Sequence, residues 1–483
     1  MPCVQNSLTC PLLMEDIWQN FHCGWKIYGK TSIANGRFKY LNDRITTMIT
    51  ADMIKNAIAD RENQLRIRFE GNIINREIPI SSADLRSGVA NIITGVRRCG
   101  KSTLAILLCG KEKYGYVNFE DERLRGIEAA DLNKVIEAVY SLKGADVDVI
   151  ILDEIQIVKG WESFVSRLAE SKKLIVTGSN AGMMSKDLAT ALTGRHMDNE
   201  LFPFSFREYL AYMGHKIDKN SAYTTSKKSA LMEELHTYMT KGAFPYLYDS
   251  KSLKEETFRG SLLLLTLYRD IIERDVVQRY RIKMATKLGD LAKYSISNIG
   301  SPISYSNAAR LLGLKSAQTA LNWMAYLQNS YLLLGLDKHT AKLKDRTIAP
   351  KKIYCIDNGI ATSIVPELLE QKGRLMENVV AIELYRRNGY GGNRSAIGYW
   401  HDYNKSEVDF VVKKGNKVNQ LIQVTFASSK AGIKDRETAS LIKASEELRC
   451  DNLLVITWDY SAEEEFKNKR ITFMPLLNWL LHQ

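Results

Sequence analysis

The stretch Ile92-Ile-Thr-Gly-Val-Arg-Arg-Cys-Gly-Lys-Ser-Thr-Leu104 contains a complete G-x-x-x-x-G-K-S pattern, from Gly95 to Ser102. An apolar, strand-like run precedes this pattern and an apolar, helix-like run follows it. Glycines at both ends let the backbone curl so that its N–H groups point inward, and the next helix adds unpaired amides at the positive end of its dipole. The stretch therefore predicts a site for the phosphates of a nucleoside triphosphate.

Within this loop we expect Lys101 to reach the β- and γ-phosphates and the Ser102 hydroxyl to bind Mg²⁺. We interpret Cys99 as a small tolerated residue in preference to an oxidation sensor. The residues expected to bind ATP are Gly95, Val96, Arg97, Arg98, Cys99, Gly100, Lys101, Ser102 and Thr103.

A second apolar run, Asp148-Val-Ile-Ile-Leu-Asp-Glu154, ends in two acids. Short unbroken apolar runs are typical of strands buried on both faces of a parallel sheet. Ligands of such sheets bind beyond the carboxyl ends of the strands, so both acids should face the phosphates. We expect Asp153 to hold Mg²⁺ and Glu154 to polarise the attacking water, which predicts hydrolysis. A solvated pair of acids at a strand end is the alternative.

The other catalytic candidates lie downstream. The third apolar run, Lys173-Leu-Ile-Val-Thr-Gly-Ser-Asn180, ends in polar side chains that could bind the γ-phosphate or the lytic water. We take Asn180 as the catalytic candidate, although a turn or a helix cap would equally use such a residue. Arg195 and Arg274 are candidates for an arginine supplied by the neighbouring subunit of a homo-oligomer, with structural ion pairs as the alternative.

Several motifs in chain order resemble the AAA-type ATPases of bacteria and archaea that carry a C-terminal DUF4143 domain. The resemblance runs from roughly Met48 to the end of the chain. It implies an AAA+ or STAND-like P-loop ATPase core, a winged helix and a C-terminal restriction-endonuclease-like α/β fold. The segments that carry the resemblance are Tyr116–Arg123, Asp153–Trp161, Leu192–Arg195, Phe202–Tyr209, Gly242–Pro245 and Ile272–Val277.

Charge is concentrated in one part of the chain. Residues 251–350 hold 16 Lys and Arg against 8 Asp and Glu, which gives +8 of the net +12. That is a plausible nucleic-acid footprint, although solvated helix faces also carry charge. Within it, Ile303–Leu327 has two runs of helical spacing around Gly313, and Tyr331–Leu336 could add the β-wing of a winged helix. Contact with DNA and simple packing beside an ATPase lid both remain open.

The C-terminal third contains part of a nuclease-like pattern. Its predicted helix and strands resemble the core of PD-(D/E)xK nucleases, which hold a metal with an acid on the helix, an Asp on one strand and an acid-x-Lys triplet on the next. Glu377 and Asp409 match, but the last triplet is Gln423-Val-Thr425 and lacks both the acid and the lysine. We therefore expect a nuclease-like fold that binds DNA without cutting it.

Composition sets the remaining bounds. The chain has 483 residues, of which 45% are hydrophobic and 25% charged, as expected for about three globular domains. No apolar run approaches the ~20 residues of a membrane helix, and no secretory signal precedes the first domain. Seven cysteines without paired spacing favour a reducing compartment over disulfides or zinc. We expect a cytoplasmic protein without membrane contact.

These patterns together predict an α/β chain of five parts. We expect an N-terminal extension at 1–47, a P-loop ATPase domain at 48–215, a helical lid and linker at 216–290, a winged helix–turn–helix at 291–348 and a nuclease-like DUF4143 domain at 349–483. The predicted function is Mg²⁺-dependent ATP binding and hydrolysis that drives a switch or motor on DNA. Two alternatives stay open: a regulatory ATPase that binds a protein partner without nucleic acid, and an ATP-coupled, metal-dependent nuclease.

Overall fold

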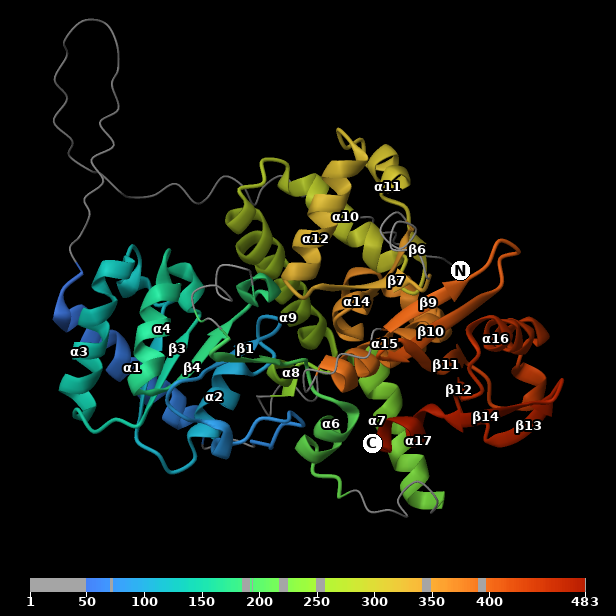
Figure 1. Cartoon of the computed structure of the whole chain (residues 1–483), viewed down its shortest axis with the longest axis horizontal. Helices are drawn as coiled ribbons and strands as arrows, with labels where there is room; N and C mark the ends of the chain where they lie inside the picture. The colour runs from blue at the N-terminus through green and yellow to red at the C-terminus, as the bar shows by residue number, and fades with distance from the viewer. Residues whose placement is uncertain are drawn as a thin grey trace, which may run out of the picture. The chain divides into compact units, whose positions relative to one another are not determined.

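The apolar runs of the first half form a parallel five-stranded sheet (Figure 1). The computed structural model describes residues 49–69, 73–184, 192, 194–216, 225–248, 257–340, 349–389 and 397–482. The strand order is β2-β3-β4-β1-β5, and every neighbouring pair is parallel. The strands are β1 (Ala90–Thr94), β2 (Tyr114–Asn118), β3 (Val149–Asp153), β4 (Lys173–Gly178) and β5 (His196–Glu200).

Helices cover both faces of this sheet. Because successive residues of a strand point to opposite faces, Ile92 packs in one apolar cluster and Ile93 in another. The cluster around Ile92 includes side chains of α1 (Ala51–Phe69), α3 (Leu132–Lys143) and α4 (Trp161–Ser171). The cluster around Ile93 includes α2 (Lys101–Cys109) and α6 (Phe206–Tyr212). Burial on both faces explains why neither β1 nor β3 alternates between apolar and polar residues.

The segment predicted as a lid is helical where it is described. It contains α7 (Thr225–Lys241), α8 (Pro245–Tyr248), α9 (Thr257–Asp270) and α10 (Ala285–Ser297). Directly after α9 the chain continues as a π-helix, η7 (Ile271–Gln278). Such wide turns are rare and occur frequently at functional sites.

The predicted helix–turn–helix corresponds to α11 (Tyr305–Leu311) and α12 (Ala317–Asn329). Gly313, between them, has a φ of +57°, which a residue without Cβ adopts at little cost. Antiparallel strands in the order β7-β8-β6 accompany the two helices. They are β6 (Pro302–Ile303), β7 (Leu333–Lys338) and β8 (Lys351–Cys355). The tip of the predicted wing, 341–348, lies outside the described residues.

The C-terminal part continues this sheet. Strand β7 pairs in parallel with β9, so nine strands join in the order β13-β14-β12-β11-β10-β9-β7-β8-β6. The predicted boundary at 348/349 falls between β7 and β8, which pair with each other. The remaining elements are α14 (Asn358–Ile364), α15 (Lys372–Gly389), β9 (Ile397–His401), β10 (Glu407–Lys414), β11 (Lys417–Thr425), α16 (Asp435–Leu448), β12 (Leu453–Thr457), β13 (Ala462–Phe466), β14 (Lys469–Pro475) and α17 (Leu476–Leu481).

Short 3-10 turns connect several elements. The predicted N-terminal extension, 1–47, lies outside the described residues. Across the described part of the chain, no helix has the length and apolar character needed to cross a membrane. The 3-10 turns are η1 (Ser82–Asp84), η2 (Glu122–Leu124), η3 (Ala129–Asp131), η4 (Ile155–Ile157), η5 (Ala181–Met184), η8 (Pro366–Glu370) and η9 (Lys430–Gly432).

Candidate functional site

The glycine-rich loop joins the carboxyl end of β1 to the start of α2. Gly95 has a φ of +154°, and a Cβ there would lie 2.1 Å from the carbonyl oxygen of Leu201, so no other residue fits. Gly100 has a φ of +104° and forms the N-cap of α2 in a left-handed conformation. The first N–H groups of α2 have no partners within the helix and are free to bind an anion.

Lys101 places a buried ammonium inside this loop. Its Nζ donates to the carbonyl oxygens of Gly95 (3.1 Å) and Val96 (3.2 Å) and lies 3.5 Å from Oε1 of Glu154. Burial alone would lower the pKa of Lys101, but Glu154 and the other acidic groups around it, Cys99, Asp153 and Asp275, together raise the pKa above its usual value. The loop therefore surrounds a permanent positive charge.

Ser102 and Asp153 lie side by side at the edge where the strands end. The Ser102 hydroxyl donates to Oδ2 of Asp153 over 2.9 Å, and Tyr116 and Thr177 donate their hydroxyls to the same carboxylate. Burial and the neighbouring Glu154 raise the pKa of Asp153, a charge effect that a bound cation would reverse. Mg²⁺ usually takes one or two carboxylate or hydroxyl oxygens from a protein and fills its shell with water and phosphate. The two residues fit that donor set.

Glu154 is held in an unusual backbone conformation. Its φ of +56° lies in the left-handed region, which is costly for a residue with a side chain. The Glu154 N–H donates to the carbonyl of Thr177 (3.1 Å), and its Oε2 accepts from the Ser179 N–H (3.1 Å). Burial would raise the pKa of this carboxyl, but the charges of Lys101 and Arg97 lower it. A fixed, ionised carboxylate of this kind can orient a water molecule and accept its proton.

The polar residues after β4 have separate partners. The Ser179 hydroxyl donates to Oδ1 of Asp275 over 3.1 Å. Asn180, our catalytic candidate, is buried, and its Oδ1 accepts from the Gly182 N–H over 2.5 Å. That bond closes a turn, which was the alternative interpretation of Asn180. Its role in catalysis stays a prediction.

In the part of the chain that the structure describes, the side chain of neither candidate arginine contacts the phosphate loop. Arg195 pairs through its carbonyl with Ala90, the first residue of β1, so it lies at the end of the sheet opposite the loop. Its guanidinium forms an exposed ion pair with Glu170 at 2.9 Å. Arg274, on η7, is 3.7 Å from Asp270 and is also exposed. Both roles remain predictions that require a second copy of the chain.

The sequence reasoning missed Asp275, which is buried on η7. Its carboxylate accepts two hydrogen bonds from Arg97 of the phosphate loop, from Nε at 3.1 Å and from Nη2 at 3.0 Å. Arg97 also pairs with Glu120 at 2.7 Å. Although burial opposes it, these two acids raise the pKa of Arg97. The only local signal was a run of three charged residues in an otherwise apolar helical segment, Ile272–Val277.

A second long-range contact ends at the strand before the loop. The Tyr331 hydroxyl lies 2.8 Å from Oγ1 of Thr94, the last residue of β1, and 3.3 Å from Oε1 of Glu200. Tyr331 follows α12 and has a φ of +63°. The segment containing the helix–turn–helix therefore touches the phosphate loop's own strand.

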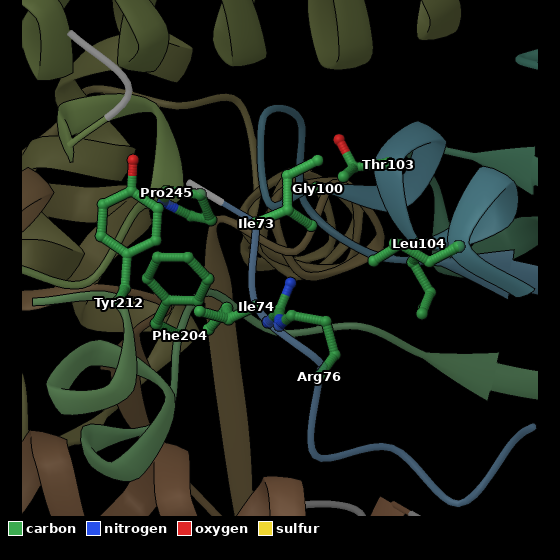
Figure 2. Close-up of a pocket in the computed structure, with 10 residues that line it drawn as sticks. Ile73, Ile74, Arg76, Gly100, Thr103, Leu104, Phe204, Tyr212 and Pro245 are labelled. Carbon is green, nitrogen blue, oxygen red and sulfur yellow. The ribbon is translucent and has the colours of Figure 1, made fainter. Parts of the chain in front are cut away.

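An apolar pocket opens beside the start of α2 (Figure 2). Figure 2 shows the rings of Phe204 and Tyr212 on the side away from Thr103 and Leu104. The two rings are 5.4 Å apart. Arg76 lines the pocket too and donates to the carbonyl oxygens of Cys99 (2.9 Å) and Phe202 (2.7 Å), which ties the pocket to the loop. The complete lining is Ile73, Ile74, Arg76, Gly100, Thr103, Leu104, Leu107, Phe204, Tyr212 and Pro245.

The nuclease-like residues also come together, around a lysine that we did not predict. The buried Lys352 ammonium lies 3.1 Å from Glu377 and 2.9 Å from Asp409. Gln423 and Thr425 stand nearby on β11 without supplying the acid or the lysine of the nuclease pattern. Among the described residues, no three His, Cys, Asp or Glu side chains are arranged to hold a metal ion.

Family models match three successive parts of the chain. They are an AAA domain over residues 88–210, a domain of unknown function (DUF8612) over 232–370 and a domain of unknown function (DUF4143) over 372–479. An uncharacterized protein of Methanocaldococcus jannaschii is 32% identical over 456 residues, which cover 91% of this chain and 97% of that protein. The chain belongs to the AAA-type ATPases that carry a C-terminal DUF4143 domain.

A second uncharacterized relative and two solved structures are also similar to this AAA–DUF4143 protein. An uncharacterized protein of Haemophilus influenzae is 25% identical over 409 residues, covering 81% of this chain and 94% of that protein. The replication initiator DnaA bound to AMPPCP and single-stranded DNA is 15% identical, with a TM-score of 0.24, and the match covers 58% of this chain and 93% of that chain. A STAND-type signal transduction ATPase of Pyrococcus horikoshii is 13% identical, with a TM-score of 0.23, over 65% of this chain and 50% of that chain. Likeness at these scores supports no functional conclusion.

Each of the two sites in this AAA–DUF4143 protein joins two of the three matched parts. The loop and β1 lie in the AAA match, whereas Asp275, which contacts the loop, and Tyr331, which contacts β1, lie in the DUF8612 match. Lys352 also lies in the DUF8612 match, but Glu377 and Asp409 lie in the DUF4143 match. Residues 232–370 thus contribute one charged side chain to each site.

Proposed function

We propose that this chain binds ATP with Mg²⁺, hydrolyses it and uses the cycle as a switch that acts on DNA. Lys101 supplies the charge for the phosphates, Ser102 and Asp153 the oxygen donors for Mg²⁺, and Glu154 the ionised carboxylate for the attacking water. When bound, Mg²⁺ would neutralise charge on the β- and γ-phosphate oxygens.

One observation carries the switch: Asp275 of η7 binds both Arg97 of the loop and Ser179 after β4. A triphosphate brings negative charge next to Arg97 and so competes with Asp275 for the guanidinium. Loss of the γ-phosphate removes part of that competition. Because the contact joins the loop to a helical element 178 residues further along the chain, nucleotide state alters how firmly that element is held.

The DNA-directed part rests on the helix–turn–helix order of α11 and α12. Gln318 at the start of α12 is exposed, as is Lys315 just before it, and the Gln318 amide donates to Asn322 on the next turn. A protein partner is the second candidate, because Leu311 and Leu321 are 60% and 37% exposed on the same two helices. A cytoplasmic setting suits the buried thiols, since the four described cysteines form no disulfide.

ATP turnover, measured with and without single-stranded DNA, duplex DNA and RNA, tests this proposal. We expect Mg²⁺-dependent hydrolysis that one nucleic acid stimulates, with DNA affinity that falls steeply with salt because cations on the protein displace counterions from phosphates. Turnover with no nucleic-acid response and flat salt dependence would favour the protein partner. Absence of hydrolysis in folded protein would refute the enzymatic part.

A further inference from the structure

The DUF4143 part contains a large polar cleft that the ATPase function does not use. Its volume is about 950 Å³, at the upper end of the ~300–1,000 Å³ typical of ligand sites. Such a space exceeds the needs of a single ion. The walls come from α15, the β9–β10 connection, β10, β11 and α16.

The floor of the cleft carries a complete internal ion cluster. The Lys352 ammonium, with no exposed side-chain surface, lies 3.1 Å from Oε1 of Glu377, 2.6 Å from Oε1 of Glu407 and 2.9 Å from Oδ1 of Asp409. The Tyr354 hydroxyl donates to the same Glu377 oxygen over 2.8 Å. A buried ammonium is stable only when acids pair with it, and these three do so. The cation that joins the carboxylates is therefore covalently part of β8.

The rim of the cleft carries exposed cations that form no ion pair with the described residues. Lys405, Lys434 and Arg436 line it, all three are exposed, and none takes part in an ion pair among the described residues. Their neighbour Lys443, by contrast, is paired with Asp402. Unpaired cations around an open cleft attract an anion more strongly than paired ones, because no protein carboxylate has to be displaced.

Aromatic side chains lie beside these cations. Phe426, on the cleft wall, is 38% exposed, and its ring already packs against the Lys372 ammonium at 5.7 Å and the Trp458 ring at 4.9 Å. Tyr403, in the β9–β10 connection next to the lining residue Asn404, is fully exposed. Cations that follow a phosphate backbone, together with aromatic faces on which unpaired bases stack, are what single strands require. Bases in a duplex are already stacked and would gain nothing from an exposed ring such as Tyr403.

We propose that this cleft binds a single-stranded polynucleotide without a metal ion and does not cut it, with the Lys352 ammonium as its built-in cation. The rim residues Lys405, Lys434 and Arg436 contact the phosphates, and the exposed Tyr403 ring stacks on a base. Lys352 offsets part of the charge of the floor carboxylates, which would otherwise repel the strand. This proposal rests on the DNA-directed part of the proposed function and gives it a location outside the helix–turn–helix.

The first test measures binding of a fluorescein-labelled oligo(dT) to the full-length protein by anisotropy in EDTA. We expect binding without metal, weakened about tenfold or more by Lys434→Gln with Arg436→Gln, and a salt slope reduced by roughly 1.4 for two lost phosphate contacts. The matched control is Lys414→Gln with Lys417→Gln, two exposed cations at the far end of β10 and the start of β11. Equal losses in both double variants, or preference for a duplex, would overturn the proposal.

The second test addresses the built-in cation. Lys352→Met leaves the carboxylates of the floor without their ammonium, and we expect it to bind oligo(dT) more weakly than the wild type in EDTA, because those charges would repel the strand. Because this variant removes a buried ion pair and could unfold, the rim variants remain the independent test. Metal-dependent cleavage of oligo(dT) by the wild type, abolished by Asp409→Ala, would refute the proposal and establish the nuclease alternative.

The same experiments separate this proposal from the broader one. ATP turnover is measured on each rim variant, and we expect it to persist without DNA because the cleft does not contribute to the phosphate loop. Rim variants that bind DNA like the wild type, with DNA-stimulated turnover intact, would refute the cleft and leave the ATPase switch standing. No DNA binding in any variant, together with unstimulated turnover, would count against both.

Discussion

Asp275→Asn tests the proposed switch most directly. The amide keeps one oxygen as an acceptor but loses the charge and one of the two bonds to Arg97. The side chains of this pair are 13% and 3% exposed, so solvent screens them little. Hydrogen bonds to charged groups contribute about 1.5–3 kcal/mol each, and we expect η7 to lose roughly 2 kcal/mol of its attachment to the loop. This should lower the Tm by several degrees.

The same change should strengthen ATP binding. In this variant the triphosphate does not have to displace a carboxylate from Arg97, and the negative charge of Asp275 near the phosphates is removed. If the whole ~2 kcal/mol appears in binding, the Kd falls by up to about 30-fold, and a gain of at least about 3-fold is expected. Titration with a fluorescent ATP analogue measures the affinity, and thermal unfolding without nucleotide measures the attachment.

The control for Asp275→Asn is Asp270→Asn. Asp270 is a partly exposed acid at the end of α9, and its ion pair is with Arg274, away from the loop. Its substitution should change neither quantity. Unchanged ATP affinity in folded Asp275→Asn protein would refute the competition between Asp275 and the triphosphate. Weaker ATP binding would refute it too, and would make Asp275 a residue that positions Arg97 for the phosphates.

Three further predictions concern single residues. Lys101→Ala should abolish ATP binding, whereas Glu154→Gln should keep binding and stop turnover, as equilibrium titration and a phosphate-release assay would show; normal turnover in Glu154→Gln would exclude it as the base. Arg195→Ala or Arg274→Ala should lower ATP turnover only in an assembled oligomer. Unaltered rates in both variants would exclude these two residues as the arginine supplied by the neighbouring subunit. Burial raises the pKa of Glu377 from 4.5 to about 7, so its charging weakens the fold as pH rises through that window. Glu377→Gln should flatten this part of the stability curve, measured by unfolding at about pH 5 and about pH 8; an unaltered curve would contradict it.

The phosphate loop could be predicted from the sequence because the residues that form it are contiguous. Eight consecutive residues from Gly95 to Ser102 provide the glycines, the lysine and the hydroxyl, and the strand and helix around them follow from local apolar runs. Asp153 and Glu154 could be predicted from the sequence for a related reason. In a parallel sheet the carboxyl ends of strands lie at one edge, so acids that end a strand meet the loop without further information.

The roles of Asp275 and Lys352 could not be predicted because their partners are distant in sequence. Asp275 is 178 residues from Arg97, and Lys352 is 57 residues from Asp409. Each looks locally like a solvated charge, and only tertiary packing shows that it is buried. The hint at Lys352 was its place in β8, an apolar strand whose central positions are buried, where an unpaired ammonium would be costly. The sequence marks such a lysine as unusual in an apolar strand, but it does not identify the acids that pair with it.

The predicted division into domains shows the same limit. Composition and motif order suggested separate winged-helix and nuclease-like parts, yet β7 pairs with β8 on one side and with β9 on the other. Strand pairing between segments of different motifs leaves no trace in either motif. The nuclease-like strands themselves were found at 407–412 and 421–426, because each is a short apolar run, and they correspond to β10 and β11.

Residues 232–370 connect the two sites through charge. They give a carboxylate, Asp275, to the arginine of the loop and an ammonium, Lys352, to the carboxylates of the cleft. Each contribution satisfies a buried group that would be strongly unfavourable alone, so this segment cannot move away from either site without exposing an unpaired charge. A triphosphate that takes Arg97 from Asp275 weakens one of these attachments, while the other holds. If a strand in the cleft changes ATP affinity, ATP must change the affinity of the cleft for the strand by the same factor, because linkage is reciprocal. Oligo(dT) binding measured with and without ATP therefore tests whether the two sites are coupled through this segment.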